Sequence, residues 1–182
     1  MGFGKLVESK ILSMFSTHNF SSASYLRNFI FGVEDSLVST VGLLSGVAIT
    51  GADARAIFIT GVILIFVEAF SMAVGSFLSE HSAEEFMLKA ETPFRQPLFL
   101  GGVMFVSYFV SGFVPLLPYV FFPLNSAFWY SIGLSLLALF LLGVVSARLS
   151  NISFVRGGAR MLTVGGIAIA VGVLVGRIVA GL

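Results

Sequence analysis

Five apolar stretches, each long enough to cross a lipid bilayer as a helix, dominate this sequence. They cover residues 28–49, 57–78, 98–121, 128–149 and 161–180. A helical crossing needs about 20 apolar residues, and these stretches lack the alternation of apolar and polar residues that a membrane β-strand requires. The sequence therefore predicts an all-α integral membrane protein with five transmembrane helices.

The composition supports this prediction and excludes other classes of protein. Only 10% of the 182 residues are charged and 57% are hydrophobic, whereas a soluble domain averages about 25% charged residues. A formal net charge of +1 gives no basic surface for nucleic acid. The sequence contains no cysteine, no H-E-x-x-H, G-x-S-x-G or Walker motif, and no nucleophile with a nearby base, so we expect neither an enzyme nor a bound cofactor.

The positive charges predict the orientation in the membrane. Arg55 and Arg177 lie on one side of the predicted topology. The other eight basic residues lie on the side of the N-terminus: Lys5, Lys10, Arg27, Lys89, Arg95, Arg148, Arg156 and Arg160. Because cytoplasmic loops carry the excess of Lys and Arg, we expect a cytoplasmic N-terminus and, with five spans, a C-terminus on the outside.

Two regions are expected along the chain. Residues 25–182 form the five-helix transmembrane domain, and residues 1–24 form a separate cytoplasmic segment. Apolar residues recur in that segment near helical spacing: Phe3, Leu6, Val7, Ile11, Met14 and Phe15. This pattern fits a short helix in the membrane interface as well as a mobile tail, and the sequence leaves both open.

Three carboxylates fall inside predicted spans, where charge is costly. Glu34 and Asp35 lie in the first span, and Glu68 lies at the centre of the second. Each costs about 2.5–3.5 kcal/mol at the centre of a membrane helix, and no Lys, Arg or His is predicted at the same depth. A single acid of this kind could be protonated and structural, but three without a cationic partner indicate a path for a metal ion or a proton.

Met72 follows Glu68 by one helical turn. Carboxylate oxygen suits hard and borderline divalent ions, and thioether sulfur favours softer transition metals. We therefore expect Asp35, Met72, Glu68 and Glu34 as metal ligands, with Asp35 and Glu68 also carrying the exchanged proton. The alternative for Met72 is simple packing.

A group of polar residues lies where the second span reaches the cytoplasm. Glu80, His81, Glu84 and Glu85 share a helix face at spacings of three or four residues. This pattern is typical of a solvated acidic helix end, and it also suits a cytoplasmic metal entrance.

Two stripes of small residues run along the first and fifth spans. The first contains Asp35, Ser39, Gly42 and Gly46. The second contains Ala168, Gly172, Gly176 and Ala180. The second stripe is typical of close helix packing, either within the chain or in a homodimer.

Four motifs, in order along the spans, resemble the vacuolar iron transporter family of divalent-metal/proton exchangers. Residues 31–40 (FGVEDSLVST) resemble the family's first-helix motif Gly-x-x-Asp-Gly-Leu-Val-Ser-Thr, and residues 69–75 (AFSMAVG) match its Ala-x-Ser-Met-x-x-Gly. Residues 112–119 (GFVPLLPY) resemble its Pro-Leu-Leu-Pro stretch, and residues 156–162 (RGGARML) resemble the start of its fifth helix. The resemblance implies that Asp35 and Met72 belong to the transport pathway.

The chain also departs from the family pattern. Asn28 stands where some members have an acid, Leu64 occupies a family glutamate position, and Ser76 replaces a glutamate found in many members. Glu68 lies one turn after Leu64 on the same face. Residues 80–97 are too few for the glutamate-rich cytoplasmic insert that many members carry between helices two and three. This chain is therefore expected to be a short member that collects metal at the pathway mouth alone.

The resemblance implies a homodimer that exports Fe²⁺, with Mn²⁺ as a second expected substrate, from the cytoplasm in exchange for protons. Mutual repulsion among close carboxylates favours their protonation when metal leaves, which couples the two ions. The expected location is a plasma or inner membrane, with the vacuole as an alternative. A passive cation channel and a non-transporting membrane scaffold remain open as alternative functions.

Overall fold

The computed structural model describes residues 17–181, with side chains from Ala23 onward, as a bundle of helices. The helices are α2 (Thr17–Ile49), α3 (Ala54–Leu88), α4 (Arg95–Leu116), α5 (Pro118–Phe121), α6 (Leu124–Leu149) and α7 (Phe154–Ala180). Five stretches within them are long and apolar enough to cross a membrane: Ala23–Ile49, Ala54–Leu88, Arg95–Phe121, Leu124–Leu149 and Phe154–Ala180. The predicted all-α integral membrane fold with five spans is confirmed.

The helices extend beyond the predicted apolar spans. Helix α3 has 35 residues and is therefore about 50 Å long at 1.5 Å per residue, more than the roughly 30 Å of a hydrocarbon core. Helix α2 begins at Thr17, inside the expected N-terminal segment, while the six apolar residues of the expected interfacial helix (Phe3, Leu6, Val7, Ile11, Met14 and Phe15) lie outside the described residues.

The third span is divided in two by proline. Helix α4 ends at Leu116, and the short helix α5 starts at Pro118. Proline has no N–H to donate to the preceding turn and is favoured at the first position of a new helix. The Ser131 hydroxyl of α6 donates to the Pro115 carbonyl at 2.6 Å, which attaches this break to the neighbouring helix.

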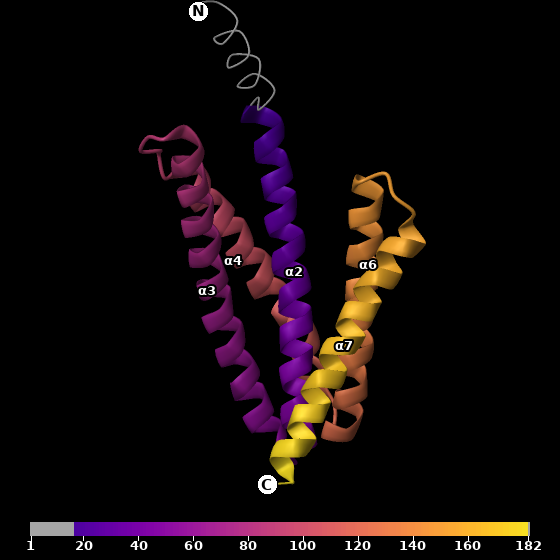
Figure 1. Ribbon diagram of the computed structural model, residues 1–182. Helices are drawn as coiled ribbons and strands as arrows, with labels where there is room; N and C mark the ends of the chain where they lie inside the picture. Colours follow the sequence, from indigo (N-terminus) through magenta and orange to yellow (C-terminus); the bar gives the residue numbers. More distant parts are fainter. Residues whose placement is uncertain (1–16, 182) are drawn as a thin grey trace, which may run out of the picture.

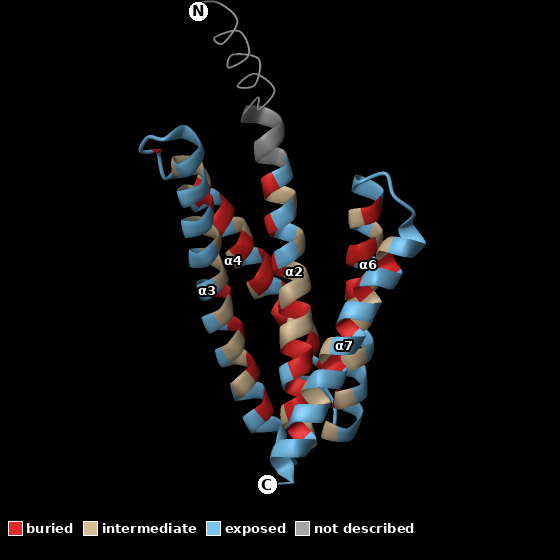
Figure 2. Cartoon of the chain, in the orientation of Figure 1, coloured by how far each residue is buried: buried red, intermediate tan, exposed pale blue. Residues whose placement is uncertain are grey.

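Helix α2 lies at the centre of the bundle, between α3 with α4 and α6 with α7 (Figure 1). Buried residues concentrate on α2, α4 and the inner face of α6, whereas α3 and α7 are mostly exposed (Figure 2). The exposed side chains are apolar and include Ile63, Phe66, Val67 and Phe70 of α3 and Ile167, Val171 and Leu174 of α7. In a membrane these outer faces are free to meet lipid or another protein chain.

The stripe of small residues on α7 packs against α2 of the same chain. A Cβ atom added to Gly46 would lie 2.7 Å from the Gly172 carbonyl oxygen, and one added to Gly42 would lie 3.3 Å from the Ala168 carbonyl oxygen. Gly42 and Gly46 therefore serve the α2–α7 contact. Of the two alternatives for this stripe, the structure shows packing within the chain.

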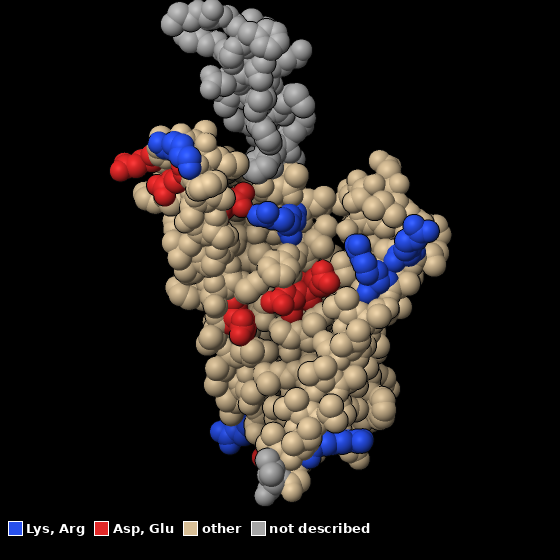
Figure 3. Space-filling view, in the orientation of Figure 1, with Lys and Arg blue, Asp and Glu red and all other residues tan. Residues whose placement is uncertain are grey.

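The described basic residues divide between the two ends of the bundle, as predicted (Figure 3). We call the end where α2 begins the N-terminal end; it also carries the end of α3 and the start of α7. Arg55 at the start of α3 and Arg177 at the end of α7 lie at the opposite end. Which end faces the cytoplasm stays a prediction.

Candidate functional site

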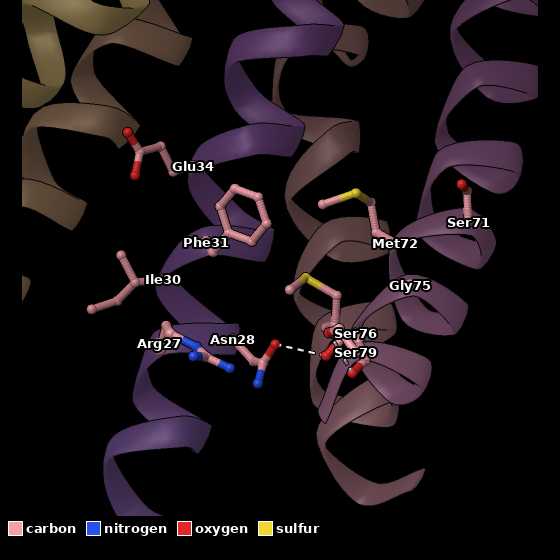
Figure 4. Close-up of a pocket in the computed structure, with 11 residues that line it drawn as sticks. Arg27, Asn28, Ile30, Phe31, Glu34, Ser71, Met72, Gly75, Ser76 and Ser79 are labelled. Atoms are coloured by element: carbon pink, nitrogen blue, oxygen red, sulfur yellow. Dashed lines mark hydrogen bonds between the residues drawn. The ribbon is translucent and has the colours of Figure 1, made fainter. Parts of the chain in front are cut away.

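A pocket of about 960 Å³ lies between α2, α3 and α4 in the half of the bundle nearer the N-terminal end. It is lined by Arg27, Asn28, Ile30, Phe31, Glu34, Ser71, Met72, Gly75, Ser76, Ser79 and Met104 (Figure 4). We refer to it as the α2–α4 pocket. Two of the four expected metal ligands, Met72 and Glu34, therefore line one cavity.

Met72 and Glu34 nevertheless point in different directions. Figure 4 shows Met72 extending from α3 toward α2, whereas Glu34 extends away from Met72 with the Phe31 ring between them. Arg160 of α7 lies close enough for its charge to attract Glu34. Helix α7 begins at Phe154, so Arg160 lies within this helix and is a nearby cation for Glu34 that the sequence did not predict.

Asp35 of α2 and Glu68 of α3 lie within electrostatic reach of each other. Both are partly buried, and their carboxylates are near enough to repel each other. Neither is among the residues that line the α2–α4 pocket. Asp35 follows Glu34 on α2 and Glu68 precedes Met72 by one turn on α3, so the two acids lie next to the pocket, toward the middle of the bundle.

Tyr108 of α4 lies near Asp35 and Glu68. The sequence did not identify it as a candidate site residue. The side chain is fully buried, its hydroxyl is 2.7 Å from the Ser39 Oγ atom, and it lies within electrostatic reach of Asp35 and Glu68. The Ser36 hydroxyl donates to the Tyr108 backbone carbonyl at 2.7 Å. The tyrosine hydroxyl within the apolar stretch 98–121 could have marked Tyr108 as a candidate, but the sequence did not show which helix this side chain faces.

Asn28 and Ser76, the two uncharged residues noted above as departures from the family pattern, form a hydrogen bond with each other. The Ser76 hydroxyl donates to the Asn28 Oδ1 atom at 2.7 Å, drawn as a dashed line in Figure 4. The Asn28 amide group donates from Nδ2 to the Ser24 carbonyl at 3.0 Å. This pair joins α2 to α3 without any charge.

Glu80, expected at the metal entrance, is bound to two side chains of α2. Its side chain is 9% exposed. One carboxylate oxygen accepts a hydrogen bond from Arg27 at 2.7 Å, and the other accepts one from the Ser24 hydroxyl at 3.1 Å. Both oxygens are therefore engaged in a link between the N-terminal end of α2 and the far end of α3.

The other three residues of the expected entrance lie further along α3. The His81 Nε2 atom is 3.4 Å from the Glu85 carboxylate, and its Nδ1 atom is 3.2 Å from the Thr92 hydroxyl. Glu84 is partly buried in the next turn. Across the residues that the structure describes, no three His, Asp or Glu side chains gather as a metal site, so these metal-binding roles stay predictions.

Comparisons with known proteins identify the family. The profile of the VIT family matches residues 26–96 and 83–177. The chain is 32% identical over 163 residues to vacuolar iron transporter homolog 5 of Oryza sativa subsp. japonica, covering 82% of this chain and 77% of the rice protein. It is 28% identical over 169 residues to vacuolar iron transporter homolog 2 of Arabidopsis thaliana, covering 86% of this chain and 85% of the plant protein.

An uncharacterized protein of Methanocaldococcus jannaschii is also similar, with 24% identity over 183 residues that cover 91% of this chain and 94% of the archaeal protein. These matches extend through all five spans and include the helices that carry Asp35, Glu68 and Met72. The chain belongs to the VIT family.

Proposed function

We propose that this protein is a transporter, not an enzyme, that exports Fe²⁺ from the cytoplasm in exchange for protons and accepts Mn²⁺ as a second substrate. The observation that carries the proposal is that Asp35 on α2 and Glu68 on α3 lie within electrostatic reach of each other. Two acids from different spans, next to a pocket that contains a thioether, form a cation pathway that needs no cofactor. The plant relatives are named vacuolar iron transporter homologs, which supports iron as the substrate.

Competition for one site explains the coupling. Two carboxylates that share a site repel each other, so at least one takes up a proton when the site holds no metal. A divalent cation replaces this proton when it binds between the acids. Alternating exposure of the pair to the two sides of the membrane then moves metal one way and protons the other.

The charge distribution supports the orientation that export from the cytoplasm requires. Six described basic residues lie at the N-terminal end of the bundle: Arg27, Lys89, Arg95, Arg148, Arg156 and Arg160. Because the cytoplasmic side carries the excess of positive charge, the α2–α4 pocket faces the cytoplasm in this proposal. A homodimer, implied by the family resemblance, belongs to the same proposal, and the exposed apolar face of α3 offers area for a second copy.

The test is Fe²⁺ flux into liposomes that contain the purified protein, with and without a pH gradient. We expect flux to rise with the gradient, and Asp35→Asn to lower it at least about tenfold because the variant loses a charge in the shared site. Glu91→Gln is the matched control, since Glu91 is an exposed acid in the α3–α4 loop. Flux that ignores the gradient would identify a channel, no flux a scaffold, and normal flux in Asp35→Asn would refute the assigned site.

A further inference from the structure

We propose that a groove between α2 and α4 binds a phospholipid with an anionic headgroup, with its phosphate at Arg95 and one acyl chain along α4. The groove has a volume of about 1010 Å³ and is lined on α2 by Phe29 and Val33. It differs from the α2–α4 pocket, because Phe29 lies roughly 200° around the helix from Phe31, which lines that pocket. We call this second cavity the Arg95 groove.

The walls of the Arg95 groove are apolar along most of its length. Among the described residues that line it, Arg95 alone is charged. Two serines also line it, but the Ser107 hydroxyl donates to the Val103 carbonyl at 2.7 Å and the Ser111 hydroxyl donates to the Ser107 carbonyl at 2.5 Å. Because both hydroxyl protons are donated within α4, these serines do not require water in the groove. Such a surface suits a hydrocarbon chain.

Arg95 lies at the end of the groove where the membrane surface is expected. Helix α4 begins at Arg95 and has no acid in its first turn, and the apolar stretch starts three residues later at Leu98. Long basic side chains near the end of a membrane helix reach the headgroup level. Arg95 is exposed, and no described Asp or Glu side chain forms an ion pair with it. Its guanidinium group is therefore available to a phosphate, which it can bind with two parallel hydrogen bonds.

The groove is long enough for an acyl chain of the same leaflet. From Arg95 to Val106, α4 rises about 16 Å at 1.5 Å per residue, which is roughly half of the 30 Å hydrocarbon core. Gly102 lies between these two residues and lines the groove. Nothing lies within 4 Å of a Cβ atom placed on Gly102, so the absence of a side chain there leaves room for the chain.

The order of these features favours a phospholipid over other apolar occupants. A phospholipid has its phosphate at the membrane surface and hydrocarbon below it, the same order as Arg95 followed by Phe99, Gly102 and Val106. A transmembrane helix of a second copy would instead bury Arg95 against apolar side chains, which is costly without an acid at that level. The cytoplasmic leaflet, which this end of the bundle is predicted to face, carries anionic lipids.

The first experiment measures the headgroup preference. The detergent-purified full chain is mixed with equal amounts of phosphatidylglycerol and phosphatidylcholine with the same acyl chains, and native mass spectrometry identifies the lipid retained most tightly. We expect about fivefold more phosphatidylglycerol, the preference that one basic residue gives near an anionic headgroup. Arg95→Gln should remove this preference. Arg148→Gln is the matched control and should retain it, because Arg148 is exposed at the same end of the bundle, in the last turn of α6.

The second experiment locates the acyl chain. Phosphatidylglycerol with a photoreactive diazirine at the middle of one acyl chain is irradiated with the protein in liposomes, and mass spectrometry maps the labelled residues. We expect labelling to concentrate on α4 between Phe99 and Val106. Gly102→Leu fills the groove and should remove most of this labelling. Gly166→Leu adds the same side chain at an equally open position on α7 and should leave the labelling unchanged.

Both measurements are independent of metal transport, so their outcomes decide this proposal alone. Equal retention of the two lipids, or a preference that Arg95→Gln leaves unchanged, would refute the role of Arg95. Labelling spread evenly over α3, α4 and α7 would indicate only the ordinary lipid layer around the protein, and labelling that avoids α4 would show that another chain covers the groove; either result would overturn the site. If Gly102→Leu does not fold, Arg95→Gln still tests the proposal, because Arg95 is exposed.

Discussion

Replacing Gly172 with alanine should destabilise the bundle, because α2 and α7 meet there through their backbones. A Cβ atom on Gly172 would overlap the backbone of Gly42, and one on Gly46 would lie 2.7 Å from the Gly172 carbonyl oxygen. Backbone atoms cannot rotate away as a flexible side chain can. Helix α7 must therefore move away from α2 to accept a methyl group.

A second glycine of the same helix provides the reference for the size of this effect. Nothing lies within 4 Å of a Cβ atom placed on Gly166, so Gly166→Ala should gain the usual helix preference of alanine over glycine, about 0.5–1 kcal/mol. Gly172→Ala gains the same preference and loses about 1–3 kcal/mol to overpacking. The helix preference of alanine is the same in both variants and cancels when they are compared. Their unfolding free energies should therefore differ by the overpacking cost alone, about 1–3 kcal/mol.

Thermal unfolding of the detergent-solubilised variants, followed by circular dichroism, measures this difference. For a chain of 150–250 residues, 1 kcal/mol corresponds to about 2–4 °C in Tm, so Gly172→Ala should unfold roughly 2–12 °C below Gly166→Ala. Equal midpoints, or a higher midpoint for Gly172→Ala, would show that α2 and α7 do not touch through their backbones and would refute the packing argument.

Two further predictions concern charged residues. Glu68→Gln keeps the shape of the side chain but cannot ionise, so metal-driven proton movement in liposomes should fall at least about tenfold; rates and pH profiles equal to wild type would instead make Glu68 a neutral packing residue. Arg27→Gln should destabilise the protein more than Glu80→Gln, by about 1–3 kcal/mol, because Glu80 (side chain 9% exposed) would remain buried without its ion-pair partner while Arg27 (66% exposed) would still reach water. Urea unfolding of both single variants and the double variant measures this asymmetry, and equal losses would contradict it.

The sequence alone determined the fold class and the number of spans. An apolar stretch of 20 residues must satisfy its own backbone hydrogen bonds inside a bilayer, and a helix does so without any partner. Helix ends were less predictable. The fifth predicted span began at residue 161, yet α7 begins at Phe154 and includes Gly157 and Gly158, which pack against Gly143 and Phe140 of α6. Tertiary contact outweighed the low helix preference of glycine.

The tertiary structure decided which side chains meet. Periodicity assigns a residue to a face of its own helix but does not say which other helix that face contacts. The sequence therefore identified Asp35, Glu68 and Met72 as candidates, but only the tertiary structure shows that Met104 of α4 lines the same pocket as Met72. The pairing of Glu80 could not be predicted for the same reason. The spacing of Glu80, His81, Glu84 and Glu85 placed them on one face of α3, but only the structure shows that α2 brings Arg27 to Glu80.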